Sequence, residues 1–433
     1  MPLLLKGNLS ARTFGIPWIE LTQTFQDAVT ITRDIGVPYV WIDSLCIVQD
    51  DREDWAKEAA RMASVYKYAY LVIAATSSKN GDDGCLRPRE PSHDLVGPTD
   101  GSIHAQRQIS HRTIIEWQAE SIAMPLLDRA WCFQERLLAS RIIHYTESEI
   151  MWECQKELWC ECQTIKLDNP STKKVETFKL AHAAAVVSTN PEMRASSWDK
   201  VVREYSQRAL TFGTDRLPGI SGIAREIALP ELGRYLAGLW ESKFPGALLW
   251  SSVSGVIDRP DVLPRPSQYS APSWSWASIV SAVNLDQTNI AKSTILVCRV
   301  IDVTCTPKTA DPYGQVEDGR LKISGPIASA TLKRTDHKYE ATRYDVVLQA
   351  TNHVVPQGKA DATFTSDILL TEPATSVIIL FIQVRSYDTM SDLAEGLVLV
   401  QSKMHTGCWE RIGRFRGWDF ELSHAKETEV VIV

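Results

Sequence analysis

The chain has 433 residues, of which 44% are hydrophobic and 23% are charged, and its net charge is −7. This composition is typical of a soluble globular protein of about two to three domains and excludes disordered, collagen-like and coiled-coil chains. The acidic balance argues against a nucleic-acid partner, and no apolar stretch approaches the roughly 18 residues of a membrane helix.

The nine cysteines follow no regular framework, and the start of the sequence has no recognisable signal peptide. These features predict reduced thiols in a cytoplasmic protein without disulfides. Cys154, Cys160 and Cys162, with His144 as a fourth ligand, are candidates for a metal site. Their spacing, C-x5-C-x-C, differs from the closely spaced cysteine pairs of usual zinc sites, so we expect neither a metal nor a cofactor.

The first part of the chain has the pattern of an α/β unit. Apolar residues at helical spacing predict a helix over 24–35, which Gly36 ends. A short β-branched and aromatic segment predicts a buried strand over 37–43. Next come a helix, which the acids at 50–54 cap, and a second strand over 70–75. Short links join the strand, helix and strand, which favours parallel pairing of the two strands.

The next elements are a helix and two strands. The pattern predicts a helix over 128–139, capped by Asp128, and strands over 140–145 and 149–153. The weakly patterned segments 79–124 and 155–200 are interpreted as surface excursions.

From about residue 290 the hydrophobic pattern changes to period two, which is typical of strands. Before that point we expect helices over 198–210 and 218–228 and another beginning within 233–240. The predicted strands after it cover 295–303, 320–324, 344–348, 377–384 and 396–401. The sequence thus predicts an α/β domain over 1–153, a helical and irregular region over 154–289, and a β-rich region over 290–433.

Glu135 is the sharpest local signal for a functional site. On a helix its neighbours three and four positions away are Trp131, Cys132, Leu138 and Ala139, and none of them is basic. Burial on such an apolar face would raise the pKa of the carboxyl group, as at many functional sites. A glutamate paired with a distant arginine is an equally good interpretation.

The end of the predicted strand over 37–43 is a second candidate. Trp41 and Asp43 would share one face, and Asp43 and Ser44 would lie at the carboxyl end, where open α/β sheets bind ligands. An Asp43 that only caps the next turn is an equally good interpretation of the sequence. Cys46 is a weakly supported nucleophile, because no histidine lies near it in the sequence.

Tryptophan is more frequent than phenylalanine or tyrosine, with 14 residues. Trp274 and Trp276 would share one face if their segment is extended. They either pack in the core, which is the commoner case, or form an aromatic wall of a binding site.

Several of these segments together resemble the fungal heterokaryon-incompatibility (HET) domain. They are Phe25–Val29, Trp41–Ile47 with Gln49, Asp54-Trp55, Ala69–Thr76 and Arg129–Glu135, within residues 8–153. Asp215–Gly222, Tyr235–Trp240 and Ala271–Ala277 resemble the regions that usually follow this domain. The best-known HET proteins trigger cell death after nonself recognition.

HET domains are remotely similar to TIR domains, some of which cleave NAD⁺. The segment from Trp131 and Cys132 to Glu135 resembles the W-C-x-x-E segment that carries the catalytic glutamate there. The resemblance implies a TIR-like, flavodoxin-like parallel sheet flanked by helices. It also implies that the Glu135 carboxylate would stabilise a ribosyl oxocarbenium ion as nicotinamide leaves.

The sequence departs from the family pattern at one point. HET domains usually open with a strand that ends in a motif such as L-S-Y-x-W-G, whereas this sequence starts with Met1–Lys6 just downstream of that position. That strand would be central in the sheet and line its cleft. We therefore expect a truncated sheet, and either the gene start is placed too far downstream or this member has lost the ancestral activity.

The favoured hypothesis is a HET-like scaffold that acts as a cofactor-independent enzyme on an apolar small molecule. An example is a cyclase or pericyclase of the Diels–Alder type in fungal secondary metabolism, with a shaped pocket and one hydrogen-bond donor. Protonated Glu135, Ser44 or Gln134 would be the donor, and Asp43 a second catalytic group. The expected lining residues are Trp41, Cys46, Trp131, Trp274 and Trp276.

Two alternatives stay open. The first is a cell-death effector that cleaves NAD⁺ as its substrate, and the second is a non-catalytic interaction module. The substrate's identity and a homo-oligomeric state are also open. Under both catalytic hypotheses, we expect Glu135 to be buried beside a cavity that Asp43 and Ser44 approach.

Overall fold

A computed structural model describes residues 2–88, 93–96, 102–105, 111, 114, 124–162, 165, 177–253, 265–285, 293–335, 343–348, 354–355, 362–368, 370, 372, 374–387, 392–418, 422 and 425–433. The chain forms two compact units, Met1–Val187 and Ser188–Val433. None of the helices within these described ranges has the length and apolar character needed to cross a membrane.

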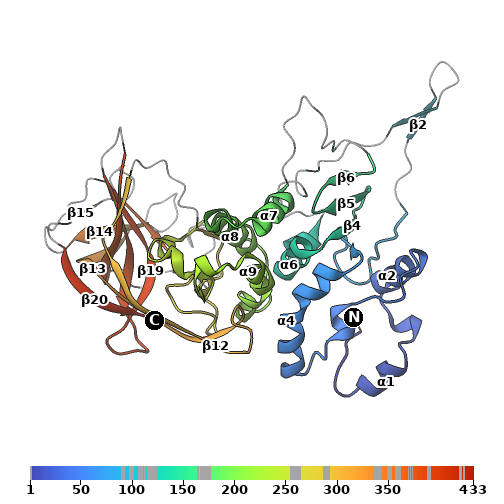
Figure 1. The fold of residues 1–433 in the computed structure, drawn as a ribbon, viewed down its shortest axis with the longest axis horizontal. Coiled ribbons are helices and arrows are strands. Elements are labelled where there is room, and N and C mark those ends of the chain that lie inside the picture. The colour runs from blue at the N-terminus through green and yellow to red at the C-terminus, as the bar shows by residue number, and fades with distance from the viewer. Residues whose placement is uncertain are drawn as a thin grey trace. The chain divides into compact units, whose positions relative to one another are not determined.

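The first unit contains helices and a small mixed sheet (Figure 1). Its α-helices are α1 (Leu9–Phe14), α2 (Gln23–Asp34), α3 (Asp43–Cys46), α4 (Arg52–Tyr68), α6 (Ala130–Leu138) and α7 (Phe178–Val187). Its strands are β1 (Val72–Ala74), β4 (Arg141–Tyr145), β5 (Ile150–Cys154) and β6 (Leu158–Cys160), with the separate hairpin β2 (His93–Val96) and β3 (Ser102–Ala105). Single 3-10 turns cover Trp18–Glu20 and Pro125–Asp128.

The four-stranded sheet has the order β1-β4-β5-β6. Strand β1 pairs with β4 in parallel, and α6 lies between them in the sequence. The pairs β4–β5 and β5–β6 are antiparallel. The predicted α/β class is therefore confirmed for this unit, with a mixed sheet that contains one parallel pair.

Local signals explain the helix ends in the first unit. Gly36 follows α2 with a φ of 71°, a backbone conformation that glycine adopts without strain. Asp51 caps α4, because its side chain accepts hydrogen bonds from the backbone N–H groups of Glu53 and Asp54. The N-cap of α6 lies one position later than predicted, at Arg129 rather than Asp128, and the helix covers Ala130–Leu138.

The predicted strand over 37–43 is wrong. Residues 37–42 have no strand assignment, Tyr39 is 86% exposed, and Asp43 already begins helix α3. No strand pairs with this segment within the part of the chain that the structure describes. A strand needs a neighbouring strand to satisfy its backbone groups. Here the Val37 N–H instead donates to the Thr32 carbonyl at 3.1 Å, and the Ile42 carbonyl accepts from the Cys46 N–H of α3 at 2.9 Å.

The segment 155–200 also differs from its prediction as an excursion. It contains β6, α7 and the start of α8 (Pro191–Ser206) where it is described. The prediction for 79–124 falls largely outside the described residues, which there include the β2–β3 hairpin.

The second unit is β-rich, as predicted, with helices in its first part. Its α-helices are α8 and α9 (Ser221–Ile227). Its 3-10 turns are Gly213–Asp215, Pro218–Ile220, Pro230–Leu232, Glu241–Lys243, Gly246–Leu249 and Trp276–Ser278. Two small antiparallel pairs are β7 (Tyr235–Leu236) with β8 (Leu239–Trp240), and β9 (Ser251–Ser252) with β10 (Val283–Asn284).

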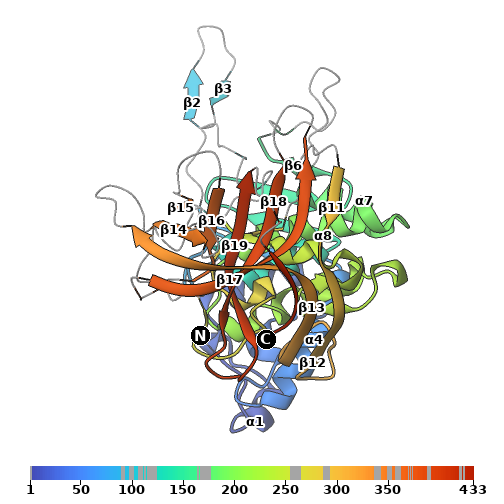
Figure 2. The ribbon, with the colours of Figure 1, turned by 90° about the vertical axis from the view of Figure 1, so that its left-hand side faces the viewer.

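A ten-stranded sheet forms the remainder of the second unit. Its strands are β11 (Ser293–Leu296), β12 (Arg299–Pro307), β13 (Val316–Thr335), β14 (Arg343–Leu348), β15 (Val354–Val355), β16 (Ala362–Ser366), β17 (Ala374–Ser386), β18 (Leu393–Gln401), β19 (Trp409–Trp418) and β20 (Lys426–Ile432). Strands β17, β18 and β19 lie side by side (Figure 2). The long strand β13 pairs with both β17 and β20, which closes five of the strands into a ring.

Candidate active site

A cavity of about 650 Å³ lies in the first unit, within the range of about 300–1,000 Å³ typical of small-molecule sites. Side chains of α2, α4, β1 and α6 and of the segments before α3 and after β1 line it. Its apolar lining includes Phe25, Trp41, Trp55, Met62, Leu126 and Trp131. Its polar lining includes Thr24, Asp43, Tyr66, Ser78, Lys79, Asn80, Arg129 and Glu135.

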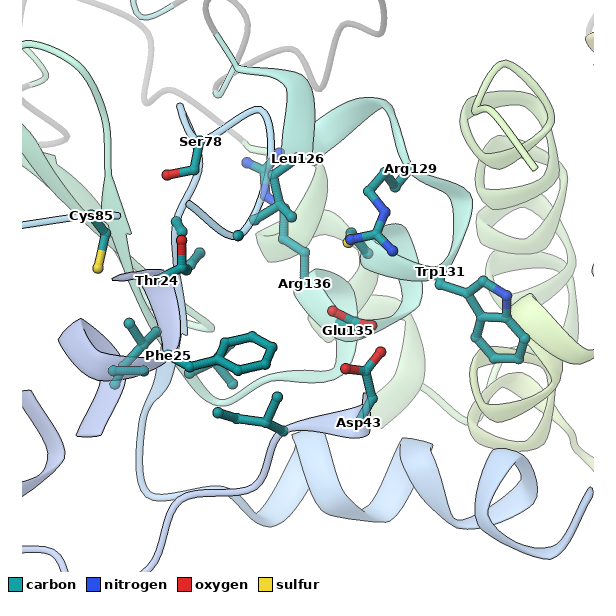
Figure 3. Close-up of a pocket in the computed structure, with 18 of the residues that line it drawn as sticks. Thr24, Phe25, Asp43, Ser78, Cys85, Leu126, Arg129, Trp131, Glu135 and Arg136 are labelled. Atoms are coloured by element: carbon teal, nitrogen blue, oxygen red, sulfur yellow. The ribbon is translucent and has the colours of Figure 1, made fainter. Parts of the chain in front are cut away.

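Glu135 lies on α6 and projects into this cavity, where its carboxylate faces that of Asp43 (Figure 3). Burial and the negative charge of Asp43 raise the pKa of Glu135 to about 7. The charge of Arg129 and hydrogen bonds from Tyr66 and Cys132 oppose this rise. At neutral pH the side chain is therefore present in both its protonated and its ionised form.

Asp43 is the first residue of α3 and is exposed at the cavity. One of its carboxylate oxygens, Oδ1, accepts a hydrogen bond of 2.7 Å from the backbone N–H of Ser44. This bond orients the carboxyl group toward Glu135, so that Asp43 both supports the first turn of α3 and belongs to the cavity.

A buried ion pair fixes helix α6 against the sheet. The Arg136 guanidinium donates two hydrogen bonds to the carboxylate of Glu153 on β5, of 2.7 and 2.9 Å. His144 on β4 is within 3.1 Å of the same carboxylate and 3.0 Å of the Thr76 hydroxyl. Burial would raise the pKa of Glu153, but the charges of Arg136 and Lys179 and the hydrogen bonds from His144 and Arg136 together hold that pKa well below its usual range. Because Arg136 follows Glu135 directly, this pair also determines where Glu135 points.

Two aromatic contacts position the walls of the cavity. Trp41 and Tyr66 form an edge-to-face pair with ring centroids 5.8 Å apart, and Trp55 and Trp131 form another at 6.2 Å. Such pairs stabilise their arrangement beyond simple area burial. Helix α4 thus contributes one aromatic residue to each pair, Tyr66 to the first and Trp55 to the second.

The structure brings together four of the predicted site residues, namely Glu135, Asp43, Trp41 and Trp131. Ser44 is 3% exposed and does not line the cavity. Gln134 is 2% exposed on another face of α6, and Cys46 is exposed at the end of α3, outside the lining.

Trp274 and Trp276 lie in the second unit and are fully buried, so they do not line this cavity. Their backbone and side chains take part in the core: the Trp276 indole N–H donates to the Gly238 carbonyl, and the Trp274 carbonyl accepts from the Trp250 indole. Core packing, the commoner alternative in the sequence, is what the structure has at both positions.

Arg129 and Tyr66 are two lining residues that the sequence reasoning did not select. Arg129 stands six positions before Glu135, beyond the helical neighbours that we considered, and the acidic groups of Cys132, Glu135 and Asp43 raise its pKa. Tyr66 lies on the apolar stripe of α4, where burial and the nearby Glu135 raise the pKa of its hydroxyl. Arg129 is the first residue of the HET segment Arg129–Glu135, and this membership was the signal in the sequence that indicated it.

The comparisons with known proteins bear on this same segment. The model of the family "Heterokaryon incompatibility protein (HET)" matches residues 5–135, which end at Glu135. No curated protein and no solved structure matches the chain. Residues 5–135 of this chain are thus similar to a heterokaryon-incompatibility (HET) domain.

Proposed function

We propose that the first unit is an enzyme that cleaves the bond between ribose and nicotinamide in NAD⁺, as part of a heterokaryon-incompatibility response. The observation that carries the proposal is the pair of facing carboxylates, Glu135 and Asp43, in a cavity that also contains Arg129. The HET domain match and the similarity of the segment ending at Glu135 to the TIR glutamate segment support it.

The lining of the cavity suits a polar, anionic ligand with flat rings. Lys79 and Arg129 supply positive charge for phosphate groups, and Ser78 and Asn80 supply hydrogen-bonding groups. Trp41 and Trp131 offer aromatic surface on which rings stack. This mixture favours a dinucleotide over an apolar small molecule.

The reaction needs an anion at the point where positive charge develops. As the C1′–N bond breaks, its electron pair leaves with nicotinamide, and the ribosyl carbon becomes an oxocarbenium ion. Ionised Glu135 stabilises that cation, and Asp43 binds a ribose hydroxyl. Water then attacks C1′ and loses a proton, which gives ADP-ribose and nicotinamide.

A second candidate is the cyclase acting on an apolar small molecule. One observation favours it: the pKa of Glu135 is about 7, so that a neutral carboxyl group is available as a hydrogen-bond donor below that pH. The two candidates need opposite protonation states of the same residue.

The pH dependence of the rate therefore tests the proposal. NAD⁺ hydrolysis by the purified protein, followed by release of nicotinamide, should rise with pH through about 7 as Glu135 ionises. Glu135→Gln should lower kcat/KM by roughly 100- to 1,000-fold, because the neutral amide cannot stabilise the cation. Glu147→Gln, the same change at an exposed position of this unit, should leave the rate unchanged.

Two results would count against the proposal. The first is a rate of NAD⁺ hydrolysis that falls as the pH rises through 7 and that survives in Glu135→Gln. It would show that the ionised carboxylate is not needed, and would favour the role of hydrogen-bond donor that the cyclase requires. Binding of NAD⁺ without release of nicotinamide by the folded protein would favour a non-catalytic interaction module.

A further inference from the structure

We infer that His111, Glu149, Cys160 and Cys162 form a structural zinc site in the first unit. One ligand atom from each residue lies within 4.8 Å of the other three. The four residues come from three separate parts of the sequence, and the fold brings them to one point beside the β5–β6 hairpin. None of them lines the Glu135 cavity, so this inference is independent of the proposed function.

The distances between the ligand atoms fit a tetrahedral ion after a small expansion. The two sulfurs are 3.2 Å apart, His111 Nε2 is 3.5 Å from the Cys162 sulfur, and it is 2.5 Å from Glu149 Oε1. Zinc bonds of about 2.3 Å to sulfur and 2.0–2.2 Å to nitrogen or oxygen require about 3.3–3.8 Å between ligands. To reach these values, the two sulfurs must separate by about half an ångström, and His111 Nε2 and Glu149 Oε1 by about 0.8 Å.

The protein backbone holds Glu149 in the orientation that an ion needs. The turn before β5 is closed by hydrogen bonds in both directions between Thr146 and Glu149, including Glu149 N–H to the Thr146 hydroxyl at 3.1 Å. Glu149 Oε2 accepts the backbone N–H of Cys162 at 3.0 Å, which leaves Oε1 directed at His111. A second hydrogen bond of this kind is what orients carboxylate ligands in metal sites.

Burial of the cluster favours an ion over a set of free thiols. Glu149 and Cys160 are each 1% exposed and His111 is 8% exposed. Thiols are weak hydrogen-bond donors, so two adjacent thiols gain little from facing each other in a buried place. When a cation binds, both thiols release their protons to the solvent, and four ligand bonds replace these weak contacts.

The set of donors selects the metal. Two thiolates and an imidazole suit zinc better than hard cations such as Mg²⁺ or Ca²⁺. Four protein ligands complete a tetrahedral shell and leave no position for a reactive water, which is typical of structural zinc. Our expectation of no metal depended on cysteine spacing alone, which could not include His111 or Glu149.

Metal content and cobalt substitution test the inference. The full chain, produced in zinc-supplemented medium, should contain one zinc ion per chain after dialysis. Replacement with Co²⁺ should give the visible bands of tetrahedral cobalt and a thiolate-to-cobalt charge-transfer band. Cys162→Ser should lose most of the zinc and this band, whereas Cys154→Ser should keep both, because Cys154 lies outside the four-residue set.

The unmodified chain decides the question even if Cys162→Ser fails to fold. Folded protein that holds no zinc and gives no thiolate–cobalt band would overturn the inference. Equal zinc loss in Cys154→Ser would overturn it too. A disulfide between Cys160 and Cys162 would also do so, and would appear as two fewer than nine thiols on titration of the unfolded, unreduced protein.

Discussion

Glu135 and Glu153 show how neighbouring groups give one residue type opposite properties. The carboxylate of Glu153 accepts two hydrogen bonds from Arg136, and this arginine, His144 and Lys179 together hold its pKa low in spite of burial. Glu135 is one position before Arg136 on the same helix but points into the cavity toward Asp43, and burial raises its pKa to about 7. The first arrangement stabilises the fold, and the second is suited to chemistry.

Glu135→Gln should therefore change how stability depends on pH. The folded state holds a proton on Glu135 up to about pH 7, whereas the unfolded state releases it near pH 4.5, so this group lowers stability as the pH rises between these values. Above pH 7, ionised Glu135 lowers the free energy of unfolding by at most about 3 kcal/mol. Solvent reduces this loss, because the side chain is partly exposed. Urea unfolding of Glu135→Gln should show a gain over the unmodified protein at pH 8 and little difference at pH 4.5.

Glu147→Gln is the control for this measurement, because its side chain is exposed and its change of charge is the same. A Glu135→Gln variant that is destabilised equally at both pH values would contradict the expected linkage.

At the scale of elements, the turn between β7 and β8 shows why two motifs of the second unit occur together. We expected a helix beginning within 233–240, but the segment forms a tight hairpin, with a φ of 45° at Ala237 and 95° at Gly238. These values exclude a helix there. The indole N–H groups of Trp198 and Trp276 both donate to the Gly238 carbonyl at 2.9 Å, and the Ser275 hydroxyl donates to the Ala237 carbonyl. The segments Tyr235–Trp240 and Ala271–Ala277 are thus two sides of one core contact.

Gly238→Ala should destabilise the second unit markedly. A Cβ at this position would lie 2.4 Å from the Trp276 Nε1, and the positive φ would add backbone strain. Gly407→Ala is the matched control, because Gly407 has a φ of 78° and open space around its missing Cβ. We expect a loss of about 1 kcal/mol for Gly407→Ala and about 3 kcal/mol for Gly238→Ala, measured by urea unfolding. Equal losses in the two variants would show that the contact with Trp276 is unimportant.

At the scale of the whole molecule, the chain divides into two units with separate cores. In the first unit, one cluster of buried residues includes Ile114, Leu127, Met151 and Leu158. In the second unit, a larger cluster lies in the ten-stranded sheet and includes Leu332, Ile379, Phe381 and Phe415. A unit with its own core has the main requirement for folding alone.

Residues 188–433, produced alone, should fold cooperatively. Near-ultraviolet circular dichroism should report fixed tryptophans, because Trp198, Trp250, Trp274 and Trp276 are fully or almost fully buried within this unit. The comparison is a fragment of residues 207–433, which lacks α8 and therefore Trp198. This fragment should lose the near-ultraviolet circular dichroism signal or become insoluble. A non-cooperative, weakly ordered 188–433 fragment would contradict the division into independent units.

The sequence by itself determined the features that depend on neighbours along the chain. Helix α2 with its end at Gly36, the capped helix α4, parts of strands β13, β14, β17 and β18, and the HET motif ending at Glu135 all follow from local patterns. These features need only the period of the apolar residues, a cap or a short motif.

Only the tertiary structure decided the features that depend on partners far along the chain. The segment 37–42 has the composition of a strand but no strand beside it in the described chain, and Arg129 faces Glu135 from outside the helical neighbours that we counted. The β5–β6 hairpin brings Glu149 close to Cys160 and Cys162, and the fold adds His111 from an earlier part of the chain. Strand pairing, ion pairs and ligand sets are fixed by contacts between distant residues, and the spacing of residues in one segment does not contain that information.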